Sequence, residues 1–171
     1  MKWRDRNNQL IEQLPFLRRY ARALTGSKLS ADELVQDCYE RACGKFYLWR
    51  RGSNLRQWMF TMMHNLHVNQ VRKTVNYPPT IPVDDADLIA PEDNSAENAS
   101  ELIALDQALN YLSMEQREVL LLVCLEDLSY EEVANTLHIP LGTVMSRLSR
   151  ARENLRKLMS GRQLPKLKRI K

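Results

Sequence analysis

Hydroxyl and guanidinium side chains are concentrated in a short segment near the carboxyl end of the 171-residue chain, between positions 142 and 150. Arginine can form two hydrogen bonds with a guanine edge, and small hydroxyls can approach bases or phosphates closely. A residue in a first helical turn also lies near free backbone N–H groups, which favour a phosphate. The segment therefore has the chemistry to contact duplex DNA. The candidate contact residues are Thr143, Met145, Ser146, Ser149 and Arg150.

One helix must present these side chains on a single face. At 100° per residue, an apolar stripe forms on the opposite face and must pack against other helices; it consists of Val144, Leu148, Ala151 and Leu155. A capping box formed by Ser129 and Glu132 opens a shorter helix at about 130–137, before this one at about 141–159. The pair predicts a helix-turn-helix whose second helix fits a major groove. The alternative is a solvated basic helix that binds nothing specific.

The rest of the chain also has helical periodicity, and no segment alternates like a strand. An apolar stripe predicts a helix over 8–25. Ser30 with Glu33 predicts a capping box that opens a helix of about 15 residues, and Ser113 with Gln116 predicts one that opens a helix at 114–125. A further helix is expected from Leu55 to about Thr74, capped by Ser53 or Asn54, and helices resume near 96. The fold class is therefore all-α.

Polar residues end the helix expected over 55–74, beside a run of aromatic residues. Aromatic stacking combined with phosphate pairing is the usual way to hold single-stranded nucleic acid. Core packing is the competing explanation for Trp49, Trp58 and Phe60. The polar candidates for a contact with a single strand are Asn65, Asn69, Arg72 and Lys73.

Residues 75–98 combine four prolines with a run of acidic side chains and cannot form a packed core. They predict an acidic linker between two small helical domains, 1–74 and 99–160, followed by a basic tail at 161–171. Residues 1–73 carry 14 Lys and Arg against 6 Asp and Glu, and residues 138–171 carry 10 against 1. Two basic ends around an acidic middle indicate two polyanion contacts, although solvated helix faces would have the same composition.

Known catalytic patterns are missing from the sequence. It has no glycine-rich phosphate loop, no nucleophile elbow and no HExxH motif. The three cysteines form no CxxC pair, and His64 and His67 have no acid or thiol at matching spacing. We therefore expect no enzyme, no catalytic residue, no cofactor and no metal. The chain has neither an apolar run long enough for a membrane span nor a signal-peptide core, so we expect no membrane insertion and a cytoplasmic location.

Several segments resemble the sigma factors of bacterial RNA polymerase. The segment from Asp32 to Ala42 resembles their helix that binds core polymerase. Asn54–Thr61 and Asn65–Lys73 resemble the adjoining promoter-melting and minus-ten segments, and Leu112–Arg152 is similar to sigma region 4. The order, the spacing and the short length match the extracytoplasmic-function (ECF) group, which has regions 2 and 4 only.

This resemblance implies a role for each group of candidates. Glu33, Gln36 and Asp37 match positions that contact the clamp of the largest polymerase subunit. The polar residues of 65–73, with Tyr77 in a base-capturing loop, match the minus-ten region. Those of 143–150 match the minus-thirty-five readers. The apolar run 120–125 is similar to the surface that docks on the flap of the second-largest subunit.

The resemblance implies three partners: core RNA polymerase, promoter DNA and an anti-sigma factor. It also gives the acidic linker residues Asp84, Asp85 and Asp87 a nucleic-acid-mimicking role, with a plain spacer as the alternative. Met145 departs from the pattern, because relatives often carry Arg or Lys there; a thioether can contact a thymine methyl group but cannot pair with guanine. Two other functions stay open, a stand-alone helix-turn-helix regulator and a sigma mimic that sequesters a regulator without touching DNA.

Overall fold

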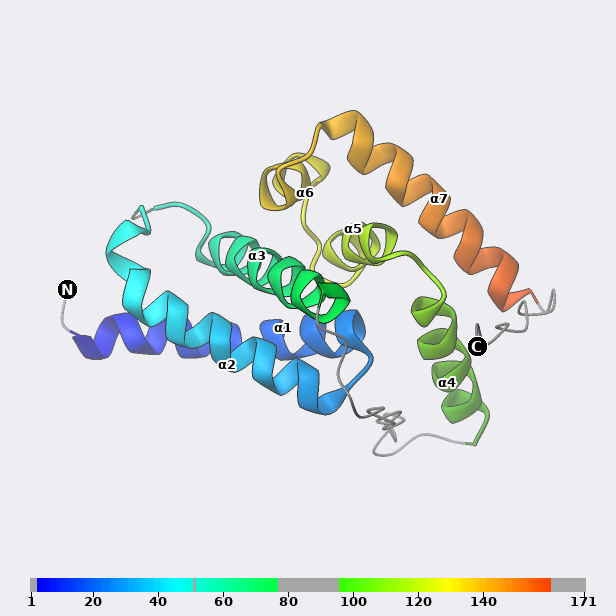
Figure 1. Ribbon diagram of the computed structural model, residues 1–171, viewed down its shortest axis with the longest axis horizontal. Helices are drawn as coiled ribbons and strands as arrows, with labels where there is room; N and C mark the ends of the chain where they lie inside the picture. Colours follow the sequence, from blue (N-terminus) through cyan, green and yellow to red (C-terminus); the bar gives the residue numbers. More distant parts are fainter. Residues whose placement is uncertain (1–2, 51, 77–95, 161–171) are drawn as a thin grey trace.

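The computed structural model describes residues 3–50, 52–76 and 96–160, and the regular structure within these ranges is entirely helical (Figure 1). The predicted all-α class is confirmed. The helices are α1 (Trp3–Thr25), α2 (Lys28–Lys45), a short 3-10 turn η1 (Phe46–Leu48), α3 (Leu55–Asn76), α4 (Ala96–Asn110), α5 (Met114–Cys124), α6 (Tyr130–Leu137) and α7 (Leu141–Met159). None of these helices is long and apolar enough to cross a membrane.

Helices α1, α2 and α3 pack together and form what we call the first domain. Its core is closed by side chains with no more than 1% of their surface exposed, among them Leu17, Leu34, Met59 and Phe60. The ring of Tyr20 meets Phe60 edge-on, with the centroids 5.0 Å apart. Pro15 lies inside α1, and the helix continues through it. Phe60 is thus a core residue, and Trp58 packs partly buried against the same core.

The junction between α1 and α2 differs from the prediction. Gly26 ends α1 with a φ of +69°, a conformation that favours glycine. Ser27 then adopts an extended conformation, and its hydroxyl accepts a hydrogen bond from the backbone N–H of Ser30. The predicted capping box at Ser30 is therefore wrong, because the cap lies three residues earlier and Ser30 is already inside the helix. Asn54 does cap α3, accepting from the N–H of Gln57 at 3.1 Å.

Helices α4 to α7 form what we call the second domain. Ser113 caps α5, and Ser129 forms a complete capping box with Glu132 at the start of α6. His138 takes a left-handed conformation, φ +54°, in the turn that leads to α7. The predicted apolar stripe of α7 packs inward, with Val144, Leu148 and Ala151 buried and Leu155 half-buried. These contacts produce the predicted helix-turn-helix.

The two domains lie against each other. Helix α5 packs on α1, and α6 packs on α3 (Figure 1). One continuous cluster of buried apolar side chains therefore runs through both domains. Gly26 lies at this contact, since a Cβ atom added to it would be only 2.8 Å from Oδ1 of Asn110 in α4. Most of the predicted linker, with Asp84, Asp85 and Asp87, lies outside the described residues, and so does the tail 161–171.

Candidate nucleic-acid interface

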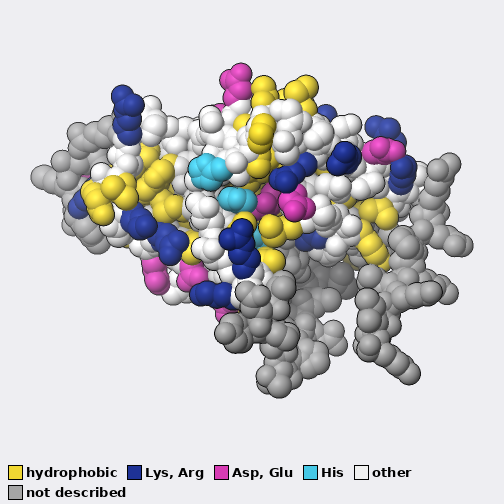
Figure 2. All heavy atoms as spheres, turned by 45° about the horizontal axis from the view of Figure 1, so that its top comes forward, with side chains coloured by type: hydrophobic (Ala, Val, Ile, Leu, Met, Phe, Trp, Pro, Cys, Tyr) yellow, Lys and Arg dark blue, Asp and Glu magenta, His cyan; other side chains and the backbone are white. Residues whose placement is uncertain are grey.

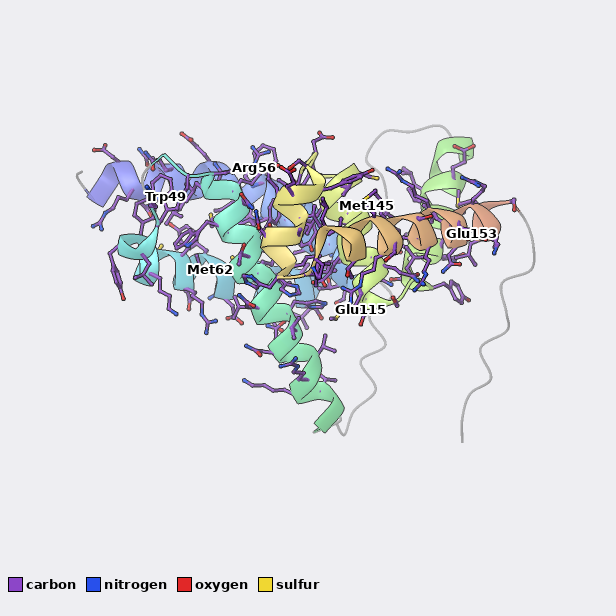
Figure 3. All side chains as sticks on the ribbon, turned by 90° about the horizontal axis from the view of Figure 1, so that it is seen from above. Trp49, Arg56, Met62, Glu115, Met145 and Glu153 are labelled. Atoms are coloured by element: carbon purple, nitrogen blue, oxygen red, sulfur yellow. The ribbon has the colours of Figure 1, made fainter. Side chains whose placement is uncertain are left out.

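The outer face of α7 is polar along its first half. Ser146, Ser149 and Arg150 are exposed, and Thr143 is half-buried. Met145 exposes 53% of its surface on the same half of the helix (Figure 3). Since Val144 and Leu148 point into the core, the packing of the helix-turn-helix turns the predicted contact residues outward. All five candidates therefore lie together on one helix half.

Two side chains beside this face were not predicted. Tyr130, the first residue of α6, and Arg152, about three turns along α7, line a hollow of about 430 Å³ together with Met145 and Ser149. Arg152 also donates to the Cys124 sulfur at 3.9 Å. The capping box that starts α6 was the one signal in the sequence for Tyr130, because it places that residue at an exposed helix start.

The second candidate face lies on the C-terminal half of α3, which projects beyond the neighbouring helices (Figure 3). Its polar side chains are exposed: Asn65, Asn69, Arg72 and Lys73. Tyr77 lies outside the described residues. The structure thus brings four of the five minus-ten candidates onto one free helical segment, separate from the face on α7.

The predicted polymerase-contact residues lie on the outer face of α2. Glu33, Gln36 and Asp37 are all exposed, because Leu34, Val35 and Cys38 turn toward the core. The Asp37 carboxylate accepts a hydrogen bond from the amide of Gln70 on α3 at 3.2 Å. This bond joins the predicted polymerase-contact face of α2 to the helix that carries the minus-ten candidates.

Charged residues at the contact between the domains were missed by the sequence analysis. Nδ1 of His64 on α3 lies 2.8 Å from Oε1 of Glu118 on α5, and Arg19 on α1 pairs with Glu126 at 3.1 Å. Burial raises the pKa of Glu126, against the lowering effect of Arg19. His64 thus has an acid partner that sequence spacing did not indicate. No group of three or more potential metal ligands occurs within the described ranges.

The apolar run 120–125 does not form the exposed docking surface that the resemblance implied. Leu120, Leu121 and Leu122 expose at most 6% of their surface. Helix α5 packs against α1 on one side and α7 on the other, which covers the run. In this arrangement of the domains, Leu120, Leu121 and Leu122 are part of the core, Val123 and Leu125 are half-buried and Cys124 is exposed.

Two family models match the chain, one in each domain. The Sigma2 domain of PhyR matches residues 10–64, and region 4 of Sigma-70 matches residues 102–155. The second match includes the helix-turn-helix and most of the polar face of α7.

Curated and solved relatives extend the similarity to nearly the whole chain. The ECF RNA polymerase sigma factor EcfG of Rhodopseudomonas palustris is 33% identical over 156 residues, which span 89% of this chain and 83% of that protein. The chain belongs to the ECF family of RNA polymerase sigma factors. The co-crystal structure of the sigma factor RpoE with the anti-sigma factor NepR from Bartonella quintana is similar to this ECF sigma factor with a TM-score of 0.80 and 33% identity. The match covers 93% of this chain and 99% of that one.

The NMR structure of the PhyRSL–NepR complex from Sphingomonas shares the fold, with a TM-score of 0.64. That match covers 96% of each chain at 22% identity. This ECF sigma factor and the PhyRSL chain therefore have the same fold.

Proposed function

We propose that this ECF sigma factor binds core RNA polymerase and directs it to promoters through two separate DNA contacts. The observation that carries the proposal is the pair of exposed polar faces, one on the free half of α3 and one on α7. The α7 face reads the minus-thirty-five duplex, and the α3 face holds the separated minus-ten strand. Membership of the ECF family supports this function over a stand-alone helix-turn-helix regulator.

The remaining partners follow from the surfaces and the relatives. Glu33, Gln36 and Asp37 form the contact with the clamp of core polymerase, since they are exposed on one face of α2. An anti-sigma factor is the third partner, as in the RpoE–NepR complex of the relative. Figure 2 shows Lys and Arg side chains spread across the visible face rather than gathered in one patch, which suits contacts with more than one partner.

We assign no catalytic step to this protein. Selecting a promoter requires binding and strand separation, and the polymerase supplies the chemistry of RNA synthesis. The charged side chains at the contact between the domains are paired with one another, Arg19 with Glu126 and His64 with Glu118, which gives them a structural role. The family is one of transcription regulators, which supports this assignment.

A sigma mimic is the second candidate function, because the region-2 match is to the domain of PhyR. PhyR is called an anti-anti-sigma factor in a complex from Bartonella quintana. A mimic needs the fold and the surface bound by the anti-sigma factor, but it does not need a DNA-reading face. The exposed Ser and Arg side chains of α7 therefore favour the sigma factor.

Arg150→Ala tests the function. Loss of one base-reading arginine should weaken promoter use by about 1–3 kcal/mol. In vitro transcription with core polymerase and a mapped promoter measures the effect. Lys157→Ala is the matched control, since Lys157 is exposed on the same helix and pairs with Glu153 at 2.6 Å.

Unchanged transcription by Arg150→Ala would contradict the assigned contact. A chain that sequesters an anti-sigma factor but never supports transcription with core polymerase would be a mimic. A chain that binds its DNA site equally well without the polymerase would be a stand-alone regulator.

A further inference from the structure

Side chains from the two domains are linked by direct hydrogen bonds at the contact of α1 and α3 with α5. The guanidinium of Arg19 donates to the Glu126 carboxylate at 3.1 Å and to the backbone oxygen of Leu125 at 2.9 Å. In the opposite direction, Arg117 on α5 donates to the backbone oxygen of Leu24 on α1 at 2.9 Å. The bond between His64 and Glu118 belongs to the same contact, which we call the domain interface. Beside it, Asn54 and Gln57 on the α3 side also donate to Glu132 of α6.

Both carboxylates of the interface are buried and belong to the second domain. Glu118 exposes 2% of its surface and Glu126 exposes 4%. The side-chain partners of these carboxylates in the described structure are His64 and Arg19, both from the first domain. Burying a charge is unfavourable unless it is paired, so the second domain depends on the first to keep these two acids buried.

The polar pairs offset part of the penalty of opening this interface. If the domains separate, water replaces the partner of each carboxylate, whereas a purely apolar interface would gain no such compensation. Glu126 already retains one oxygen, Oε2, that is buried without a hydrogen-bond partner. Hydration of that oxygen favours the open form.

Closure has a cost for binding. While the interface is closed, α5 is covered by α1 on one side and by α7 on the other. Leu120, Leu121 and Leu122 are then buried and inaccessible to any other protein, whereas Cys124 at the end of α5 stays exposed. A partner that needs α5 exposed can bind only the open state. Its apparent affinity is therefore the intrinsic affinity multiplied by the fraction of molecules that are open, and closure lowers that fraction.

We propose that the pairs Arg19–Glu126 and His64–Glu118 form a latch that holds the two domains closed, and that this closed state competes with the binding of core RNA polymerase. The proposal rests on the proposed function for its second half. Its first half, the closed state held by these two pairs, is a property of the chain alone.

The native cysteines allow the closed state to be measured directly. Cys43 on α2 and Cys124 on α5 are exposed, one in each domain. Cys38 is buried, and burial raises the pKa of its thiol to about 12, so that it stays unreactive. Spin labels on Cys43 and Cys124 therefore report the separation of the domains by double electron–electron resonance in the full chain.

Arg19→Ala is the test variant, with Arg18→Ala as its control, because Arg18 is an exposed base on the same helix outside the interface. Removing Arg19 takes the hydrogen-bonded cation from the buried carboxylate of Glu126, although Arg56 still acts on that carboxylate. Because Arg19 itself is half-exposed, the open population should rise by up to about tenfold rather than by the larger effect of breaking a fully buried pair. His64→Ala should act in the same direction through Glu118. Circular dichroism melting of each variant shows that the domains remain folded.

The exchanged pair tests whether charge holds the latch. Arg19→Glu with Glu126→Arg restores opposite charges across the interface and should return the distance distribution toward that of the unaltered chain. If the swap fails to fold, Arg19→Lys is the second variant, because it keeps a positive charge opposite Glu126 and should leave the domains closed. An unchanged distance in both Arg19→Ala and His64→Ala would overturn the latch.

Affinity for core polymerase tests the competition. Titration of the labelled chains with core polymerase should show binding by Arg19→Ala that is up to about tenfold tighter than that of the unaltered chain or Arg18→Ala. If Arg19→Ala opens the domains without binding core polymerase more tightly, the closed state does not compete with polymerase binding. If even the unaltered chain fails to bind core polymerase, the proposed function fails, while the distances still decide whether the latch exists.

Discussion

His67 shows how the position of a single side chain changes its chemistry. It is half-buried on α3 and lines a cavity at the contact between the domains, next to Arg117. Burial lowers the pKa of His67 below its ordinary value of 6.5, with Glu118 opposing this and His64 and Arg117 adding to it. The folded protein therefore binds a proton at this site less readily than the unfolded chain does.

This shift predicts a loss of stability in acid. Between the lowered pKa and 6.5 the unfolded state binds more protons, so the free energy of unfolding falls as the pH decreases through this window. Urea midpoints at pH 7.5 and 5.5 should differ less for His67→Gln than for the unaltered chain. His138→Asn is the control, since His138 is exposed and asparagine also accepts a left-handed backbone. An equal pH effect in both variants would rule out His67 as the cause.

Residue types predicted the exposed polar side chains and the apolar stripe of α7 well, and the buried carboxylates poorly. Ser146, Ser149 and Arg150 are exposed because the helical period decides which face of α7 packs inward. Glu118 and Glu126 were not expected at a site, since their partners lie 54 and 107 residues away in the sequence. A buried carboxylate can be recognised only when the tertiary contact that pairs it is known.

At the scale of helices, the caps decide where each one begins. Ser27 and Ser30 both precede apolar periodicity, but only Ser27 lies outside the helix with an extended backbone. Replacing a capping serine by alanine costs about 1 kcal/mol. Ser27→Ala should therefore lower the free energy of unfolding by about 1 kcal/mol. Ser30→Ala should leave it unchanged or raise it slightly, because alanine favours a helix interior. Chemical denaturation measures the free energy of unfolding of both variants. If Ser30→Ala were the more destabilising of the two, Ser30 and not Ser27 would be the cap.

Helix boundaries followed the sequence where caps and turns agreed. For α6 and α7 the predicted and observed ranges coincide, because a complete capping box and a constrained turn enclose a strongly periodic stretch. At the start of α2, two serines three residues apart offered competing caps. The left-handed Gly26 decided between them by releasing the chain into an extended conformation at Ser27.

The whole molecule presents its two proposed DNA faces on different domains. Substitutions on separate, non-contacting sites usually add within about 0.5 kcal/mol. Lys73→Gln on α3 and Arg150→Ala on α7 should thus weaken promoter binding by the holoenzyme additively. The test compares both single variants and the double variant at one salt concentration, because phosphate contacts depend strongly on salt. A coupling well above that range would mean that the two faces do not act as independent anchors.

The arrangement of the two domains had no counterpart in the sequence patterns. Periodicity and caps act over a few residues, whereas the pairs that join the domains span the acidic segment between them. The run 120–125 shows the result, since its apolar character was consistent both with a docking surface and with a core. Only the packing of α5 between α1 and α7 distinguishes the two.

Gly26 lies both at the end of a helix and at the contact between the two domains. A side chain at this position would be opposed twice, once by the positive φ that ends α1 and once by the amide of Asn110 across the domain contact. The exposed amide of Asn110 could rotate away from a new side chain, but the positive φ would remain. A compensating change at Asn110 could therefore relieve the contact between the domains and not the strain at the end of α1.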